Sequence, residues 1–208
     1  IYRGGAALVV ARLRVHGQHM DPVVTRRDID RAGLTRSALT DALRCCLIRV
    51  RRGVYVLRPG CTASAHRDLR RMTDEESSAR LADIDRPGVR GAAARLHFLA
   101  QSYGHSLPQD CVLSHLSAAL LWALPLTRAV QTRAEVARPA RSCRYRQLLV
   151  RKRSLLPEEV TSVDGMRATT VRRTLLDVAL DYPLDVSVPM IDHALRAKLL
   201  TTDDLTTM

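Results

Sequence analysis

Few residues of this sequence are spaced for catalysis or metal binding. Cys111 and His115 are four residues apart and could point the same way on one helix, yet two ligands do not make a metal site. His115 is interpreted instead as a core or capping histidine. Ser114 directly precedes His115, and because adjacent side chains point apart on a helix, no Ser–His dyad is expected. Asp177 and Asp192 are expected on polar helix faces, as solvated charges.

The motifs of nucleotide and nuclease chemistry are also missing. The sequence has no glycine-rich phosphate loop. One large nuclease class needs an acid two residues before its lysine, where Lys152 has Val150 and Lys198 has Arg196. We therefore expect a protein that is not an enzyme, with no catalytic residue, no metal ligand and no cofactor.

One set of residues does have a regular spacing, and their side chains are of the kind that binds nucleic acid. Arg36, Thr40 and Arg44 are four residues apart, with Ser37 beside Arg36, so a helix would carry them on one face. Arginine, serine and threonine side chains can reach guanine edges and phosphates in DNA. The spacing predicts a helix that enters the major groove.

Capping signals indicate a first helix just before that one. Thr25 and Asp28 have the spacing of a capping box, and Val24 and Ile29 fit the apolar staple around it. Gly33 can take the left-handed conformation that ends a helix. A short helix between Thr25 and Gly33 is therefore expected.

The second helix has its own cap and apolar face. Thr35 is its expected N-cap, and Leu34 with Leu39 would form its staple. Apolar residues recur at helical spacing and should face the core: Leu39, Ala42, Leu43, Cys46 and Leu47. Two helices joined by a glycine-containing turn are the helix-turn-helix pattern.

A basic hairpin is expected directly after the second helix. β-Branched residues over 48–57 flank a turn at 51–53, which is typical of two antiparallel strands. A hairpin in this place is the wing of a winged helix, and the apolar segment 6–15 would supply the third helix. The predicted DNA-binding residues are Arg26, Arg27, Thr35, Arg36, Ser37, Thr40, Arg44, Arg49, Arg51 and Arg52. The alternative is a small helical domain whose exposed face is basic only for solubility.

The charge of the whole chain supports a nucleic-acid partner. Its 208 residues include 33 basic and 21 acidic side chains, which gives a net charge of +12. A second basic cluster is formed by Arg138, Arg141, Arg144, Arg146, Arg151, Lys152 and Arg153. This cluster could be a solubilising face, a second contact to the DNA backbone, or a patch for an acidic or nucleotide-handling partner.

The element pattern predicts an α+β protein in three parts. Residues 1–60 form the winged helix, 61–110 a helical connector with helices over 66–81 and 92–103, and 111–208 a mixed α/β domain. In the last part we expect helices over 114–124, 171–180 and from Ser187 and Thr202, with strands over 129–136, 146–153 and 166–169. Five cysteines without a C-x-x-C motif and the lack of a bilayer-length apolar run predict reduced thiols in a cytoplasmic protein without membrane contact.

Several blocks of this sequence resemble the AbiEi antitoxins of abortive-infection toxin–antitoxin systems. The N-terminal blocks are Val24-Thr25-Arg26-Arg27, the segment 33–38 and Arg52-Gly53-Val54-Tyr55; the C-terminal blocks are 113–119, 124–126, 163–166, 173–177 and 192–196. The resemblance implies a type IV antitoxin that represses its own operon at inverted repeats in double-stranded promoter DNA. Its C-terminal domain would counter a nucleotidyltransferase toxin, with direct contact between the two left open.

Two other functions fit the same residues. A stand-alone winged-helix regulator would have a ligand-sensing pocket in its C-terminal half and no adjacent toxin gene. A non-catalytic accessory module of a nuclease system would bind specific and random DNA alike.

Overall fold

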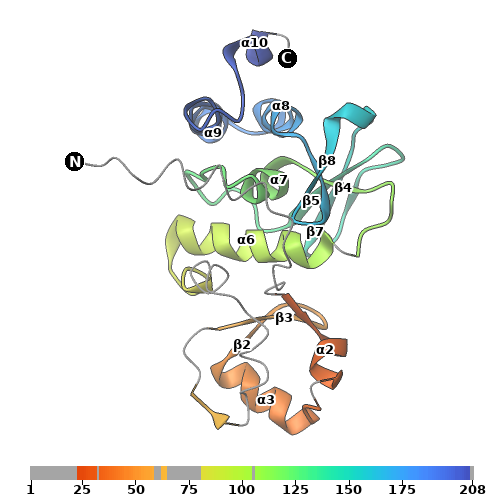
Figure 1. The fold of residues 1–208 in the computed structure, drawn as a ribbon, viewed down its shortest axis with the longest axis vertical. Coiled ribbons are helices and arrows are strands. Elements are labelled where there is room, and N and C mark those ends of the chain that lie inside the picture. The colour runs from red at the N-terminus through yellow and green to blue at the C-terminus, as the bar shows by residue number, and fades with distance from the viewer. Residues whose placement is uncertain (1–22, 32, 59–61, 65–80, 105, 207–208) are drawn as a thin grey trace, which may run out of the picture.

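The computed structural model describes residues 23–31, 33–58, 62–64, 81–104 and 106–206 (Figure 1). These residues form an α+β structure with two sheets, as the sequence predicts. The helix expected over 6–15 and nearly all of the one expected over 66–81 lie outside the described residues. Among the described residues, no helix is both long and apolar enough to cross a bilayer.

Residues 23–58, the N-terminal unit, contain two helices and a three-stranded antiparallel sheet. In chain order they are β1 (Val23–Thr25), α2 (Arg26–Arg31), α3 (Arg36–Cys45), β2 (Leu47–Arg51) and β3 (Val54–Leu57), and the strand order is β1-β3-β2. The expected hairpin is confirmed as β2–β3, with Gly53 at a φ of 75° in its turn. Strand β1 was not expected. It pairs with β3 and closes the sheet on its other side.

The capping signals of the N-terminal unit are confirmed. The Thr25 amide donates to Asp28 Oδ2 over 2.9 Å, and the Ala38 amide donates to Thr35 Oγ1 over 3.2 Å. Gly33 has the left-handed φ of 72° that the end of α2 requires. The predicted apolar face is buried except for Leu43, which is 36% exposed. Leu43 lies at the edge of the buried stripe, so helical spacing alone placed it wrongly in the core.

The C-terminal sheet has six strands in the order β6-β7-β5-β4-β9-β8. Their bounds are Val112–Leu113 (β4), Ala134–Arg138 (β5), Cys143–Arg144 (β6), Leu148–Lys152 (β7), Val160–Val163 (β8) and Met166–Thr169 (β9). Strand β5 is parallel to β7 and β4 is parallel to β9, while the other neighbours are antiparallel. The three expected strands correspond to β5, β7 and β9, although β5 begins at Ala134 rather than at 129.

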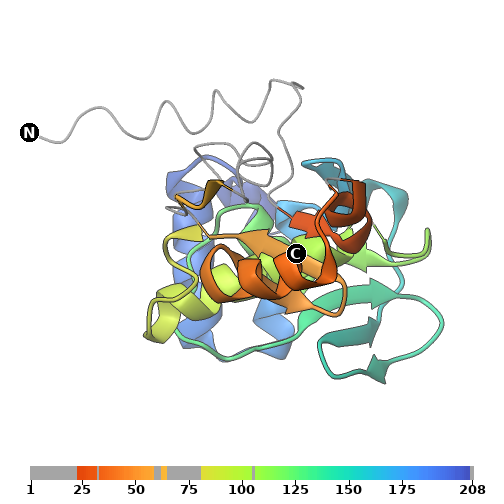
Figure 2. The same cartoon turned by 90° about the horizontal axis from the view of Figure 1, so that it is seen from below.

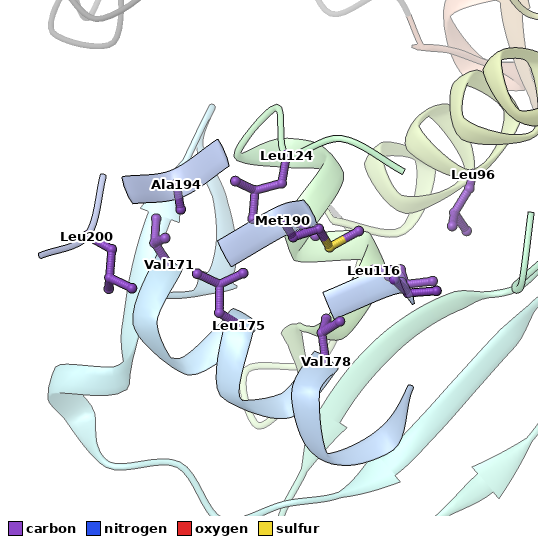
Figure 3. Packing of buried hydrophobic residues seen from close by; sticks show 11 residues of the cluster. Leu96, Leu116, Leu124, Val171, Leu175, Val178, Met190, Ala194 and Leu200 are labelled. Carbon is purple, nitrogen blue, oxygen red and sulfur yellow. The ribbon is translucent and has the colours of Figure 1, made fainter. Parts of the chain in front are cut away.

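Helices cover this sheet on both sides (Figure 1). They are α6 (Gly88–Gly104), α7 (His115–Leu121), α8 (Val171–Asp181), α9 (Leu184–Arg196) and the short α10 (Thr202–Thr206), with a 3-10 turn at Pro157–Glu159. Val136 and Val150 pack with Ala100 of α6. Because side chains alternate along a strand, Glu135 and Arg151 point to the opposite face, toward α8. In the main core, Figure 3 shows Met190 of α9 between Leu124 and the side chains of α8.

Helix α9 begins three residues earlier than expected and carries a proline inside it. Pro189 cannot donate the helical hydrogen bond to the carbonyl of Asp185, four residues before it. The hydroxyl of Thr127 donates to that carbonyl instead, over 2.7 Å. This replacement lets the helix start at Leu184, whereas the sequence placed the proline in the first turn.

Helix α6 joins the two parts of the molecule. Its Phe98 packs with Val56 of β3, and its Leu96 and Ala100 belong to the cores of the C-terminal part. The expected connector over 61–110 therefore includes a helix that shares both cores. Helix α3 lies on the side of the N-terminal unit turned away from α6, as the view from below in Figure 2 shows.

Candidate nucleic-acid interface

Helix α3 exposes the side chains that the spacing selected. Leu39 and Ala42 are buried, whereas Arg36, Ser37 and Thr40 are exposed on the other side of the helix. The Arg36 guanidinium makes no ion pair with any described carboxylate. Thr40 donates its hydroxyl to the Arg36 carbonyl over 3.0 Å, so its oxygen is still able to accept a bond from a ligand.

The second arginine of α3 has a weak internal partner. Arg44 lies 3.8 Å from Asp41, and both side chains are largely exposed. Exposed ion pairs of this kind are strongly screened by solvent. Arg44 can therefore exchange Asp41 for a phosphate or a base edge at little cost.

The two arginines at the start of α2 differ in availability. Arg26 donates to Asp30 over 2.9 Å, and this bond raises the pKa of the guanidinium. Arg27 is exposed and has no ion pair with a described carboxylate. A phosphate would have to displace Asp30 to bind Arg26. It could bind Arg27 without displacing a described carboxylate.

The hairpin β2–β3 presents two of its three predicted arginines to solvent. Arg49 and Arg52 are exposed. Arg51 instead points to α6, where its Nε donates to the Ser102 hydroxyl over 3.0 Å and its guanidinium lies 4.6 Å from the centre of the Tyr103 ring. Arg51, predicted as a DNA contact, therefore has its guanidinium held against α6 rather than presented to solvent.

The second basic cluster divides in the same way. Arg141, Arg144, Arg146 and Lys152 are exposed and make no ion pair with a described carboxylate, whereas the other three arginines are paired. Arg138 bonds Asp110 over 2.6 Å. Arg151 and Arg153 both bond Asp181 of α8, over 3.0 and 2.8 Å. Arg151 and Arg153 are therefore held against acids of the C-terminal part, whereas the pair of Arg138 with Asp110 lies at the surface, with the two side chains 35% and 41% exposed.

A fully buried carboxylate organises these internal pairs. Glu135 has no exposed side-chain surface and accepts from Arg151 over 2.7 Å. It also accepts from the Tyr182 hydroxyl over 2.8 Å and from the Leu116 amide over 3.1 Å. Burial and the charge of Glu135 raise the pKa of Tyr182 well above its usual value, so the phenol stays a donor. A lone acid inside the apolar strand 134–137 is the sequence signal that points to this cluster.

His115 belongs to the same buried cluster, which confirms its interpretation as a core histidine. Its contact with Ser114 corrects the expectation that the two side chains point apart. Its Nδ1 lies 2.9 Å from Ser114 Oγ and its Nε2 lies 2.9 Å from Asp181 Oδ2. Adjacent side chains meet here because His115 has a φ of 50° and is not in regular helical conformation. Burial lowers the pKa of His115, so the ring is neutral near pH 7. Ser114 and His115 are both fully buried.

Asp177 is likewise buried, although a solvated position was expected. It accepts from Arg173 over 3.1 Å and lies 3.6 Å from Arg153. Arg173 continues the network to Glu159, over 3.0 Å. The periodicity of α8 could suggest the pair with Arg173, four residues earlier on the same helix, but not Arg153, which comes from the distant segment after β7.

Cysteine 111 does not combine with His115. Burial raises the pKa of the Cys111 thiol, and its sulfur contacts Asp110 over 3.8 Å. Within the described ranges, no three histidine, cysteine or acidic side chains gather closely enough to hold a metal ion.

Comparison with known protein families finds none that matches this chain, and comparison with curated proteins finds no match either.

Proposed function

We propose that this chain binds double-stranded DNA sequence-specifically through a winged helix formed by its N-terminal unit. Helix α3 would lie in the major groove, and the hairpin β2–β3 would be the wing. The observation that carries the proposal is the set of exposed arginines without an ion pair among the described residues: Arg27, Arg36, Arg49 and Arg52. These four side chains have no described carboxylate to leave before they bind a phosphate or a base edge.

The biological role that we propose is that of an autorepressing antitoxin. Two copies would meet an inverted repeat in the promoter, one per half-site, and the C-terminal part would counter a nucleotidyltransferase toxin encoded beside it. This role rests on the resemblance of the sequence blocks to AbiEi antitoxins. The DNA-binding part rests independently on the charges of α3 and the wing.

Electrophoretic mobility with the DNA upstream of the gene tests the proposal. Scrambled DNA of the same length, at physiological salt, is the comparison. A preference on the order of a thousandfold is expected for a specific regulator. Equal binding to both DNAs would contradict the proposal and favour the accessory module of a nuclease system.

One cavity supports a second candidate function, a regulator that senses a ligand. It has a volume of about 240 Å³ and lies between β2, α6 and the C-terminal part. Ile48, Leu96 and Leu99 supply apolar walls, and Arg49 and Gln147 supply polar groups. Ligand pockets are usually about 300–1,000 Å³, so this cavity would take only a small ligand. Release from the promoter by a small carboxylate metabolite, in a genome without a neighbouring toxin gene, would favour this function.

A further inference from the structure

The strands β6 and β7 are joined by a tight turn that exposes two arginines. Cys143 pairs with Val150 and Arg144 with Leu149. The Tyr145 amide then donates to the Leu148 carbonyl over 2.8 Å, which leaves residues 146 and 147 at the centre of the turn. We call residues 144–147 the hairpin tip.

The backbone of the hairpin tip is fixed by bonds to strand β5 and the residue before it. Arg133 Nε donates to the Tyr145 carbonyl over 3.0 Å, and the Ala134 amide donates to the Gln147 carbonyl over 3.0 Å. A tip held in this way loses little conformational entropy when it binds a partner. Its arginines are therefore presented from a preorganised support.

The charge of the hairpin tip has no internal compensation. Arg144 and Arg146 are exposed, and neither makes an ion pair with a carboxylate in the part of the chain that the structure describes. The sequence from 136 to 157 contains no acidic residue. Tyr145, between the two arginines, is 54% exposed and adds a hydroxyl that can donate to an anion.

The hairpin tip touches the proposed wing directly. Gln147 Nε2 donates to the Val50 carbonyl of β2 over 2.9 Å, although the two residues are 97 positions apart in the sequence. Val50 follows Arg49, one of the exposed wing arginines. Figure 2 looks onto the N-terminal unit from below and shows the strands around this tip extending beside the wing. The wing and the tip, two segments far apart in the sequence, are thus in contact, and both carry exposed arginines.

We propose that the hairpin tip is a second, sequence-independent contact to the phosphate backbone of the same DNA duplex. Arg144 and Arg146 bind phosphates next to the stretch that the wing covers, so the C-terminal part lengthens the footprint of the N-terminal unit. This inference rests on the proposed DNA binding. A phosphate partner suits the tip better than an acidic protein, because the tip offers cations on a rigid turn beside a basic wing.

The test is the double variant Arg144→Ala/Arg146→Ala in the full chain. Each lost phosphate contact lowers the slope of log affinity against log salt by about 0.9 on B-DNA. We expect a slope flatter by about 2 and binding weaker by about tenfold at physiological salt, equally on upstream and scrambled DNA. The charge-conserving Arg144→Lys/Arg146→Lys variant should keep the wild-type slope.

A matched control removes two arginines that are already ion-paired. Arg128 pairs with Asp185 and Arg196 with Asp192, both over 3.1 Å. The Arg128→Ala/Arg196→Ala variant loses the same charge and should bind DNA like the wild type. Equal weakening by this control would overturn the inference, because net charge alone would then explain the effect.

Failure of the inference and failure of the proposed function give different results. If wild-type protein shows no preference for the upstream DNA, the proposed function fails. Only the inference fails if the wild-type protein has that preference and the tip variant binds with the same affinity and the same salt dependence as the wild type. The tip then faces solvent or an acidic protein. A loss confined to the upstream sequence would also overturn it, because a phosphate contact carries no sequence preference. A hydroxyl-radical footprint that shortens in the tip variant supports it.

Discussion

The N-terminal unit and the buried cluster of the C-terminal part use the same residue type in opposite ways. In the N-terminal unit, arginines such as Arg36 and Arg52 are exposed and lack a described carboxylate partner. In the C-terminal part, Arg151 and Arg173 lie against the buried acids Glu135 and Asp177. A buried acid needs a paired cation, because removing the cation leaves an uncompensated charge in the interior. An exposed cation without an acid partner can bind a phosphate directly. Basic composition alone therefore does not show which cations are available to an anionic partner, because that depends on the position of the acids.

The largest expected effect comes from breaking the buried pair of the C-terminal part. Arg151→Ala leaves Glu135 buried without its cation, which should cost about 3–5 kcal/mol of unfolding free energy. For a chain of this length, the midpoint of thermal unfolding should fall by about 6–20 °C. Calorimetry or urea unfolding measures it. Arg146→Ala is the control and should leave stability unchanged; an equal loss in both variants would contradict the comparison.

The next largest effect should come from the N-terminal arginines and should leave stability untouched. Arg36→Ala removes a side chain that we place in the major groove, at a cost of about 1–3 kcal/mol in affinity for the upstream DNA. Fluorescence anisotropy with that DNA measures the loss, and thermal unfolding should match the wild type. Full affinity in the Arg36→Ala/Arg44→Ala variant would show that α3 is not the recognition helix.

The pH dependence of stability tests the buried cluster of the C-terminal part that contains His115. Burial holds the pKa of His115 below the ordinary 6.5, so the unfolded chain binds a proton that the folded chain does not. Stability should therefore fall as the pH drops below about 6.5, by at most about 1.4 kcal/mol per pH unit for one proton. Urea unfolding between pH 7.5 and 5 measures this slope.

The variant that isolates this slope is His115→Asn, since asparagine tolerates the positive φ at this position. It should be less stable at pH 7.5 and should lose the part of the slope that His115 causes. An unchanged slope in this variant would assign the proton to another group.

The smallest expected effect concerns Arg51. It contacts α6, whereas the other two arginines of the hairpin β2–β3, Arg49 and Arg52, are exposed. Arg51→Ala removes its bonds to Ser102 and its contact with the Tyr103 ring, which should cost about 1 kcal/mol of stability. Arg52→Ala should instead weaken DNA binding a few-fold and leave stability unchanged. Urea unfolding measures the stability of both variants, and mobility shifts measure their DNA binding. Together they compare an internal arginine with an exposed one at adjacent positions of the wing. A larger DNA-binding loss for Arg51 than for Arg52 would reverse our assignment.

The sequence by itself determined the local structure of the N-terminal unit. Thr25, Asp28, Gly33 and Thr35 act within a few residues of their own positions, so their capping roles could be inferred without knowing the fold. The same holds for Thr170, whose hydroxyl accepts from the Arg173 amide at the start of α8. The exposed face of α3 followed from its period, since the buried face of a short amphipathic helix fixes the other one.

Only the tertiary structure decided which charges are free. Arg51 and Arg52 are neighbours with the same side chain, yet α6 binds one of them and leaves the other exposed. Glu135 and Arg151 are brought together by the pairing of β5 with β7, and Asp181 is added by α8. An ion pair depends on a distance of a few ångströms between segments that are far apart in the chain. Spacing along the sequence contains no information about that distance, because it is fixed only when the sheet and helices pack.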